Sequence, residues 1–137
     1  MDRLTSERRS WLMSQVKGKN TGPEMIVRRL VFSMGYRYRL HVPNLPGKPD
    51  MVFAGRMKVI FVNGCFWHGH LGCRLGRLPK TRVEFWEAKI LKNVERDRRN
   101  TKLLEEEGWE VLTIWQCQLN DISEVSKKLR SFLERQF

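Results

Sequence analysis

The chain has 137 residues, 41% of them hydrophobic and 30% charged, which is the size and balance of one compact globular domain. No apolar run approaches the length of a membrane span, and the first residues lack the apolar stretch of a secretory signal, so we expect a cytoplasmic protein that does not enter a membrane. The net charge of +11 favours a polyanionic partner, and nucleic acid is a better candidate than anionic lipid because no basic helix with an apolar anchor face stands out.

The first part of the chain divides into a basic arm and the start of a domain. Residues 1–20 are polar and basic, and we expect an arm or a loosely held helix there, followed by a single domain over residues 21–137. A helix is predicted to begin at Thr21-Gly-Pro-Glu24, with a Pro in its first turn, and to end at Gly35. Its helical period is supplied by Ile26, Leu30, Val31 and Met34.

Three short strands are predicted next. Residues 36–42 alternate as a strand does, residues 45–49 form a turn, and residues 50–54 and 58–62 are apolar runs. Gly55-Arg56 between these runs predicts a hairpin with a two-residue type II′ turn. That turn would pair residue 53 with 58 and Asp50 with Phe61, so that Asp50 lies beside Val62 and Asn63.

The second half is predicted to contain one long helix over residues 82–107, ended by Gly108, and a strand over residues 109–115. Trp109 and Trp115 in that strand are expected in the core. Asp121 or Ser123 then begins an amphipathic helix. The predicted order is therefore helix, three strands, helix, strand, helix.

Cysteine and histidine are concentrated in the stretch NGCFWHGHLGC, residues 63–73. Cys65, Cys73 and the distant Cys117 are all the cysteines of the chain, and with one imidazole they would form a closed tetrahedral zinc set. Three unrelated thiols are the alternative. Either His68 or His70 can be the fourth ligand, and the spacing does not choose between them. The remaining histidine would be a general-base candidate near Asp50.

The acidic residues offer a second kind of site. Asp50 ends a turn and either caps it or binds Mg²⁺, which prefers oxygen ligands. Asn93 and Asp97 are four residues apart and share one helix face, where Asp97 can orient a histidine. For Glu24, a favourable interaction with the dipole of its helix is the simpler interpretation.

Two aromatic pairs flank these motifs. Phe66 and Trp67 lie between the metal-ligand candidates, and Phe85 and Trp86 begin the long helix. Such pairs either pack into the core or insert into an apolar partner such as a base stack.

These residues together resemble a known family. The stretches LPGKPD, VIFVNGCFWHGH, FWEAKILKNVERDRR and GWEVLTIWQC, in this order over residues 21–117, are similar to the very-short-patch mismatch repair (Vsr) endonucleases. The resemblance implies an α/β fold with the restriction-endonuclease-like PD-(D/E)xK core and a structural zinc loop. It also implies a nick of one strand of double-stranded DNA, dependent on Mg²⁺, 5′ to the thymine of a T:G mispair left by deaminated 5-methylcytosine.

The resemblance also implies a role for each matching residue. Mg²⁺ would contact Asp50 and the backbone carbonyl of Val62, with Glu24 and Asp97 further out, and His68 would be the general base. Zn²⁺ would be held by Cys65, His70, Cys73 and Cys117. The aromatics Phe66, Trp67 and Trp86 would wedge into DNA beside the mispair. We further expect a monomer, with mismatch-repair proteins as candidate partners.

Asn63 is the main departure from the family. The well-studied repair member has a second active-site histidine there, and asparagine cannot move a proton near neutral pH, so activity should depend more heavily on His68. Two alternatives to the mismatch endonuclease follow. One is a catalytically silent zinc-containing DNA-binding module, and the other is a nuclease of the same fold with a different DNA target.

Overall fold

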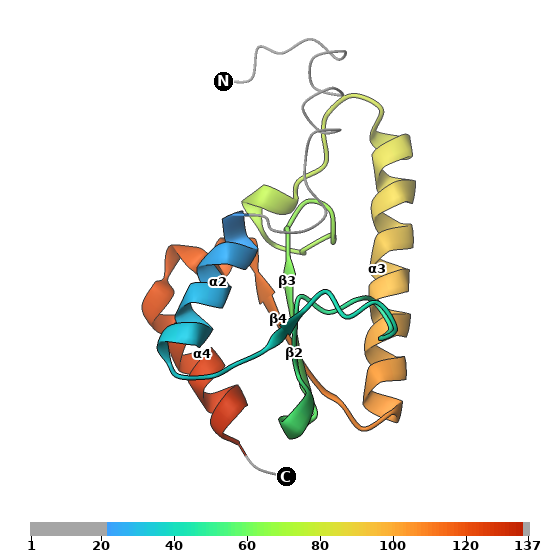
Figure 1. The fold of residues 1–137 in the computed structure, drawn as a ribbon. Helices are drawn as coiled ribbons and strands as arrows, with labels where there is room; N and C mark the ends of the chain where they lie inside the picture. The colour runs from blue at the N-terminus through green and yellow to red at the C-terminus, as the bar shows by residue number, and fades with distance from the viewer. Residues whose placement is uncertain (1–21, 136–137) are drawn as a thin grey trace.

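The structure is a computed structural model that describes residues 22–135. The predicted arm, residues 1–20, lies outside them. The chain folds into a mixed α/β domain whose sheet lies between helices (Figure 1). Its elements are α2 (Gly22–Ser33), β1 (Arg39–Leu40), β2 (Met51–Phe53), β3 (Lys58–Asn63), α3 (Val83–Glu106), β4 (Glu110–Trp115) and α4 (Ile122–Glu134), with short 3₁₀ turns at Ala54–Arg56, Arg74–Gly76 and Gln116–Asn120.

The strands stand in the order β1-β2-β3-β4. β1 and β2 pair antiparallel, as do β2 and β3, whereas β3 and β4 pair parallel. A parallel pair needs a long crossover, and α3 provides it. The predicted order of helices and strands is therefore confirmed.

The two faces of the sheet are covered by different helices. One core cluster joins α2 and α4 to the face formed by Met51, Phe53, Ile60, Val62 and Ile114. The opposite face packs against α3, with Val52, Val59 and Leu104 at its centre. Neighbouring residues of β2 and β3 thus point to opposite faces, as the period of two in a strand requires. Within residues 22–135, no helix combines the length and the hydropathy that crossing a membrane requires.

Two local predictions are wrong. The first strand is limited to Arg39–Leu40, because His41 turns the chain away with a φ of 51°. The hairpin turn is a 3₁₀ turn over Ala54–Arg56, and Met57 takes the left-handed conformation there in place of Gly55. The predicted register is nevertheless confirmed, because Phe53 pairs with Lys58.

The helix termini follow their sequence signals more closely. α3 ends at Glu106, just before Gly108 with its φ of 95°. Asp121 caps α4, and its side chain accepts a hydrogen bond of 3.2 Å from the backbone N–H of Glu124. The helical periodicity predicts the buried residues less accurately. In α2, Ile26 is exposed and Val27 is buried instead, and Ile122 at the start of α4 is also exposed.

Lys58, the first residue of β3, is unusual because its side chain is fully buried. Its ammonium group donates hydrogen bonds to the backbone carbonyls of Phe132 and Arg135 at the end of α4. It also lies 3.6 Å from a carboxylate oxygen of Glu110. A charged group is thus buried with partners from a helix that lies 74 residues further along the chain.

Candidate active site and metal centre

The loop over residues 63–73 begins where β3 ends and packs against α3. Gly69 allows this packing, because a Cβ there would lie 2.7 Å from a methyl carbon of Val94 and 2.8 Å from one of Ile90. Its φ of 62° also favours glycine. His68 and His70 are therefore fixed on either side of one glycine and can face different partners.

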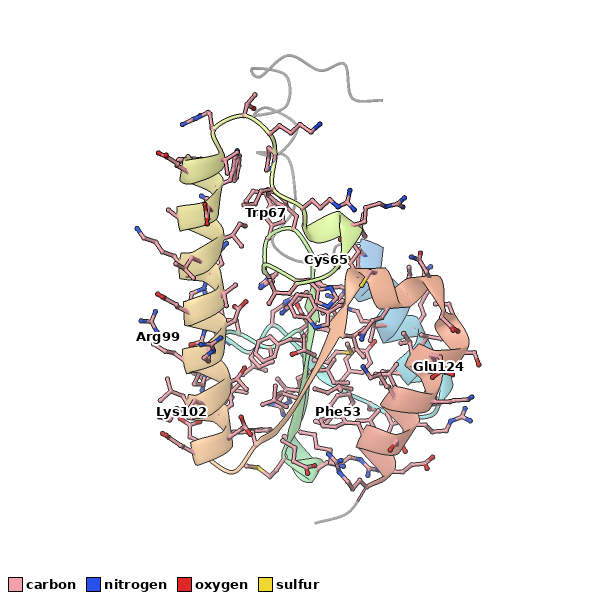
Figure 2. The ribbon with its side chains drawn as sticks, turned by 180° about the vertical axis from the view of Figure 1, so that it is seen from behind. Phe53, Cys65, Trp67, Arg99, Lys102 and Glu124 are labelled. Atoms are coloured by element: carbon pink, nitrogen blue, oxygen red, sulfur yellow. The ribbon has the colours of Figure 1, made fainter. Side chains whose placement is uncertain are left out.

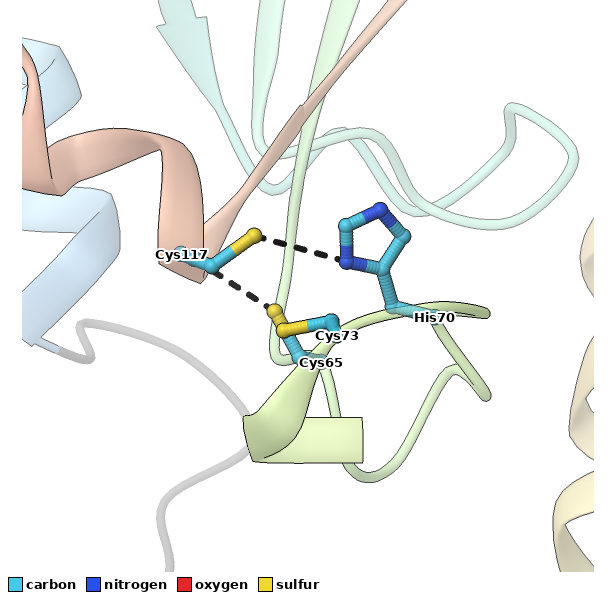
Figure 3. Close-up of side chains that lie close together, drawn as sticks. All are labelled: Cys65, His70, Cys73 and Cys117. Carbon is cyan, nitrogen blue, oxygen red and sulfur yellow. Dashed lines mark hydrogen bonds between the residues drawn. The ribbon is translucent and has the colours of Figure 1, made fainter. Parts of the chain in front are cut away.

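His70 belongs to a cluster of sulfur and nitrogen ligands, which we call the Cys/His cluster: Cys65, His70, Cys73 and Cys117 (Figure 3). One ligand atom from each residue lies within 4.8 Å of all the others. His70 Nδ1 is 3.4 Å from Cys117 Sγ, and the Cys117 backbone N–H donates to Cys65 Sγ over 3.3 Å. The side chains of this cluster can therefore hold one metal ion.

Two neighbours fix the shape of the Cys/His cluster. The imidazole of His70 stacks on Trp115, with ring centroids 4.2 Å apart and an interplanar angle of 8°. Trp115, the last residue of β4, is thus half-buried against a metal-ligand candidate. The expectation that it lies in the core is met only in part. Gly76 lies against the loop so closely that a Cβ would come within 2.4 Å of the His70 carbonyl oxygen.

The thiols of the cluster differ in acidity. Burial raises the pKa of Cys65 to about 12. Desolvation also acts to raise the pKa of Cys73, but hydrogen bonds with His70 and with other groups of the cluster outweigh it and lower that pKa to about 6. The surroundings of Cys73 thus favour its thiolate, which is the form that binds a metal.

His68 faces away from the Cys/His cluster and towards α3. Its Nδ1 lies 2.6 Å from a carboxylate oxygen of Asp97, and both side chains are partly exposed. A carboxylate accepts a hydrogen bond from Nδ1–H, which leaves Nε2 as the basic nitrogen of the ring. The structure thus assigns the two histidines to separate groups of partners, a choice that the spacing left open.

Asp50 lies beside the end of β3, as the register predicted. Its carboxylate accepts a hydrogen bond of 2.6 Å from the backbone N–H of Val62. Burial is the largest of the effects that raise the pKa of Asp50 to about 8, and a side-chain hydrogen bond with Glu24 adds to it. Two carboxylates in such contact share a proton unless a cation replaces it. We call Glu24 and Asp50 the carboxylate pair.

A cavity of about 600 Å³ opens between α3, the loop and the ends of β3 and β4. Asn63, His68 and Asp97 line it together with Phe61 and Trp115. Asn63 is largely buried, so its amide is held in place at this cavity, next to the residue that contacts Asp50.

The aromatic residues that the sequence singled out meet at the N-terminal end of α3. Phe66, Trp67 and Trp86 form a triangle of edge-to-face contacts with centroids 5.1–5.9 Å apart, and Phe85 touches Trp86 at 5.1 Å. We call these four residues the aromatic cluster. Asn93 donates a hydrogen bond of 2.9 Å to the backbone carbonyl of Trp67. Figure 2 shows Trp67 beside the first turns of α3, on the same side of the domain as Cys65.

Sequence reasoning missed two residues next to the carboxylate pair, the buried Arg28 and the half-buried His41 that contacts it. Arg28 lies 2.9 Å from Glu24, and His41 lies 3.0 Å from Arg28. The four-residue spacing of Glu24 and Arg28 on one helix was a signal that would have found the first contact. No local pattern pointed to His41, because the chain brings it back from the far side of a turn.

A carboxylate pair at the end of β3 and a histidine–aspartate contact between the loop and α3, on a mixed sheet in a basic chain, are typical of a nuclease. The catalytic domain of the homing endonuclease I-Bth0305I has a similar structure, with a TM-score of 0.58 and 26% identity over 82% of this chain and 94% of that one. The class of protein is therefore a DNA endonuclease with a restriction-endonuclease-like core, which hydrolyses phosphodiester bonds.

Sequence comparisons identify the family. The family model described as DNA mismatch endonuclease Vsr matches residues 1–74. The chain is 53% identical over 97% of its length to the type II nicking enzyme V.XorIIP of Xanthomonas oryzae pv. oryzae, whose length is also 97% covered. It is 45% identical over 81% of its length to the DNA mismatch endonuclease Vsr of Escherichia coli, 70% of which is covered. The chain belongs to the Vsr family.

Proposed function

We propose that this endonuclease nicks one strand of double-stranded DNA 5′ to the thymine of a T:G mispair, such as deamination of 5-methylcytosine leaves. Membership of a family described as mismatch endonucleases supports this substrate, and relatives named as nicking enzymes support the cut of a single strand. The contact of His68 with Asp97 is the observation that carries the proposed reaction, because it supplies an oriented base at the cavity beside Asn63.

The carboxylate pair is the proposed Mg²⁺ site, together with the backbone carbonyl of Val62. The fit is good because Asp50 and Glu24 offer oxygen ligands in contact with each other, and their shared proton is the one that a divalent cation would displace. A bound Mg²⁺ would supply positive charge against the negative charge that builds up on the reacting phosphate.

His68 is the proposed general base. Asp97 accepts a hydrogen bond from Nδ1–H and so orients the ring with Nε2 as the nitrogen that can take a proton. Nε2 takes a proton from water, the water oxygen bonds to phosphorus, and the bond from phosphorus to the leaving deoxyribose oxygen breaks. Solvent returns a proton to that oxygen. Asn63 can orient the attacking water through its amide, but it cannot take the proton.

Zn²⁺ is the proposed occupant of the Cys/His cluster, with a structural role. Three thiolates and one imidazole complete a tetrahedral set and leave no open position for substrate. The cluster ties the loop of residues 63–73 to Cys117 after β4, and so it holds His68 in place.

Phe66, Trp67 and Trp86 are proposed to insert between bases beside the mispair. Large rings that remain partly exposed at one end of the domain are costly in water and suit an unstacked base step. The basic net charge would hold the phosphate backbone around them.

A panel of duplexes tests the proposal. Purified holoprotein with Mg²⁺ is incubated with T:G, T:A and C:G duplexes of one sequence, with each strand labelled in turn. We expect a single nick in the thymine strand of the T:G duplex, at least about tenfold faster than any cut in the matched ones.

Two outcomes would contradict the proposal, and each points to an alternative. Binding without cleavage in Mg²⁺ and in Mn²⁺ would indicate a silent DNA-binding module. Equal cleavage of matched duplexes would indicate a nuclease with a different DNA target. Repeating the panel with several flanking sequences shows whether a failure to cut comes from the wrong sequence around the mispair or from a protein that does not cleave DNA.

A further inference from the structure

Arg28 is a buried cation that the proposed reaction does not yet use. It lies one turn after Glu24 on α2, and its guanidinium contacts the Glu24 carboxylate at 2.9 Å. The side chains of this pair are only 8% and 4% exposed, whereas those of the surface pair Lys127 and Glu124 are 73% and 66% exposed. Water therefore screens the Arg28 contact far less than an ordinary helix ion pair.

A second hydrogen bond helps to fix the position of the guanidinium. The same nitrogen of Arg28 lies 3.0 Å from Nε2 of His41. A guanidinium can only donate, so Nε2 accepts and the ring carries its proton on Nδ1. His41 reaches this position because its backbone has a φ of 51°, which is uncommon for a residue other than glycine. The hydroxyl of Tyr38 also bonds the backbone carbonyl of Arg28 over 3.3 Å.

Glu24 connects Arg28 to the candidate catalytic carboxylate. Its side chain hydrogen-bonds Asp50, and the charge of Arg28 also acts on Asp50 directly, opposing the effect of burial. A chain of contacts thus runs from His41 through Arg28 and Glu24 to Asp50. Once both carboxylates are ionised they repel each other, and the Arg28 guanidinium is a nearby cation that offsets this repulsion.

We propose that Arg28 is a positioning residue for DNA cleavage, which holds the Glu24 carboxylate against Asp50 in the arrangement that receives a divalent cation. His41 supports it by accepting a second hydrogen bond from the same guanidinium nitrogen. Lysine would supply the charge but not the other guanidinium nitrogen, which lies 3.2 Å from the sulfur of Met25. This inference rests on the proposed function, because it assigns the carboxylate pair to the nicking reaction.

Steady-state nicking of the T:G duplex in Mg²⁺ gives the first test. Arg28→Met should lower kcat about 10–100-fold and change KM less than about twofold, because only the alignment of the carboxylates is lost. Arg28→Lys should recover part of kcat. Arg29→Met is the matched control, since it removes the same charge from the exposed side of the same helix and should leave kcat unchanged. Thermal melts establish that each variant is folded at the assay temperature.

A double-mutant cycle with Glu24→Gln separates positioning from a general structural role. If Arg28 acts through Glu24, Arg28→Met should cost almost nothing in kcat once Glu24→Gln is present. If the two losses multiply, or if Arg28→Met and Arg29→Met have the same effect, the proposal is wrong.

A crystal structure of metal-free Arg28→Met at a pH well above 8, where Asp50 has lost its proton, gives a readout that does not depend on activity. We expect the Glu24 carboxylate to leave its contact with Asp50, and finding it in place would overturn the positioning role. A wild-type protein that cuts no duplex would refute the proposed function instead. The position of Glu24 in the crystal would still show whether Arg28 holds that carboxylate against Asp50.

Discussion

The Cys/His cluster and the carboxylate pair differ in almost every physical property. The cluster collects four protein ligands of soft type within 4.8 Å of one another, with Cys65 fully buried among them. The carboxylate pair offers hard oxygen ligands, and Asp50 contacts Val62, which precedes the cavity-lining residue Asn63. A closed set of ligands suits a metal that holds structure, and an incomplete set leaves room for water and phosphate.

The two histidines show how little sequence separates these regions. His68 and His70 differ by one glycine, yet His68 contacts Asp97 and His70 contacts Cys117. Removing a group from the carboxylate side should therefore affect rate, and removing one from the cluster should affect stability first.

The largest effect is expected at Asp50. Asp50→Asn should lower the nicking rate at least about 10³-fold, because the neutral amide cannot hold the divalent cation. Affinity for the T:G duplex, measured by gel shift, should stay within about threefold. Glu124→Gln removes an exposed acid from α4 and serves as the control with full activity. A cleaving Asp50→Asn protein would remove the carboxylate pair from the reaction.

His68 should follow, with a loss of about 10²–10⁴-fold for His68→Gln, the range typical of a general base. The matched change on the cluster side is His70→Cys, which keeps a zinc set of four thiolates. We expect it to retain both zinc and most of the activity. Equal losses in the two variants would show that the loop does not separate two functions.

Cys117→Ala should act first on the cluster. Removing one of four ligands should release zinc and lower the Tm by roughly 5–15 °C, with activity lost as the loop loosens. Cys117→His keeps four ligands and is the control. Zinc content by atomic absorption and a calorimetric melt decide the outcome. An unchanged zinc content in Cys117→Ala would refute the four-ligand assignment.

The raised pKa of Asp50 predicts a smaller effect on stability in Mg²⁺-free, zinc-loaded protein. The folded protein holds the Asp50 proton up to about pH 8, whereas the unfolded chain releases it near 3.8. The folded state thus binds more protons between these values, and the free energy of unfolding falls as pH rises through that window. The Tm should therefore fall more steeply from pH 6.5 to 8.5 in wild type than in Asp50→Asn. Parallel curves would contradict this prediction.

The smallest effect is expected at Asn63, which lines the same cavity as His68. Asn63→His should change the nicking rate less than about tenfold, because His68 already supplies a base. It should, however, reduce the loss caused by His68→Gln, because a second imidazole can take over proton transfer. An undiminished loss in the double variant would show that residue 63 does not reach the reacting water.

Sequence reasoning succeeded where interactions between residues close in sequence determine the local structure. The ends of α3 and α4 follow from Gly108 and Asp121, which act within one turn of the helix. Asp50 was correctly placed beside Val62 although the turn type was wrong, because the register depends on the pairing of residues 53 and 58. The prediction for the first strand failed at its end because His41 takes a left-handed backbone conformation and contacts Arg28, which no local pattern encodes.

The buried Lys58 has a consequence for how the chain folds during synthesis. Its ammonium group is stabilised by carbonyls at the end of α4, which leaves the ribosome 74 residues later. Until that helix docks, burying the charge in β3 costs several kcal/mol, so the central strand cannot settle early. A nascent chain would thus keep its nuclease core open until α4 has been made and has docked, and a deletion that removes Phe132 and the residues after it would leave the core in the same open state.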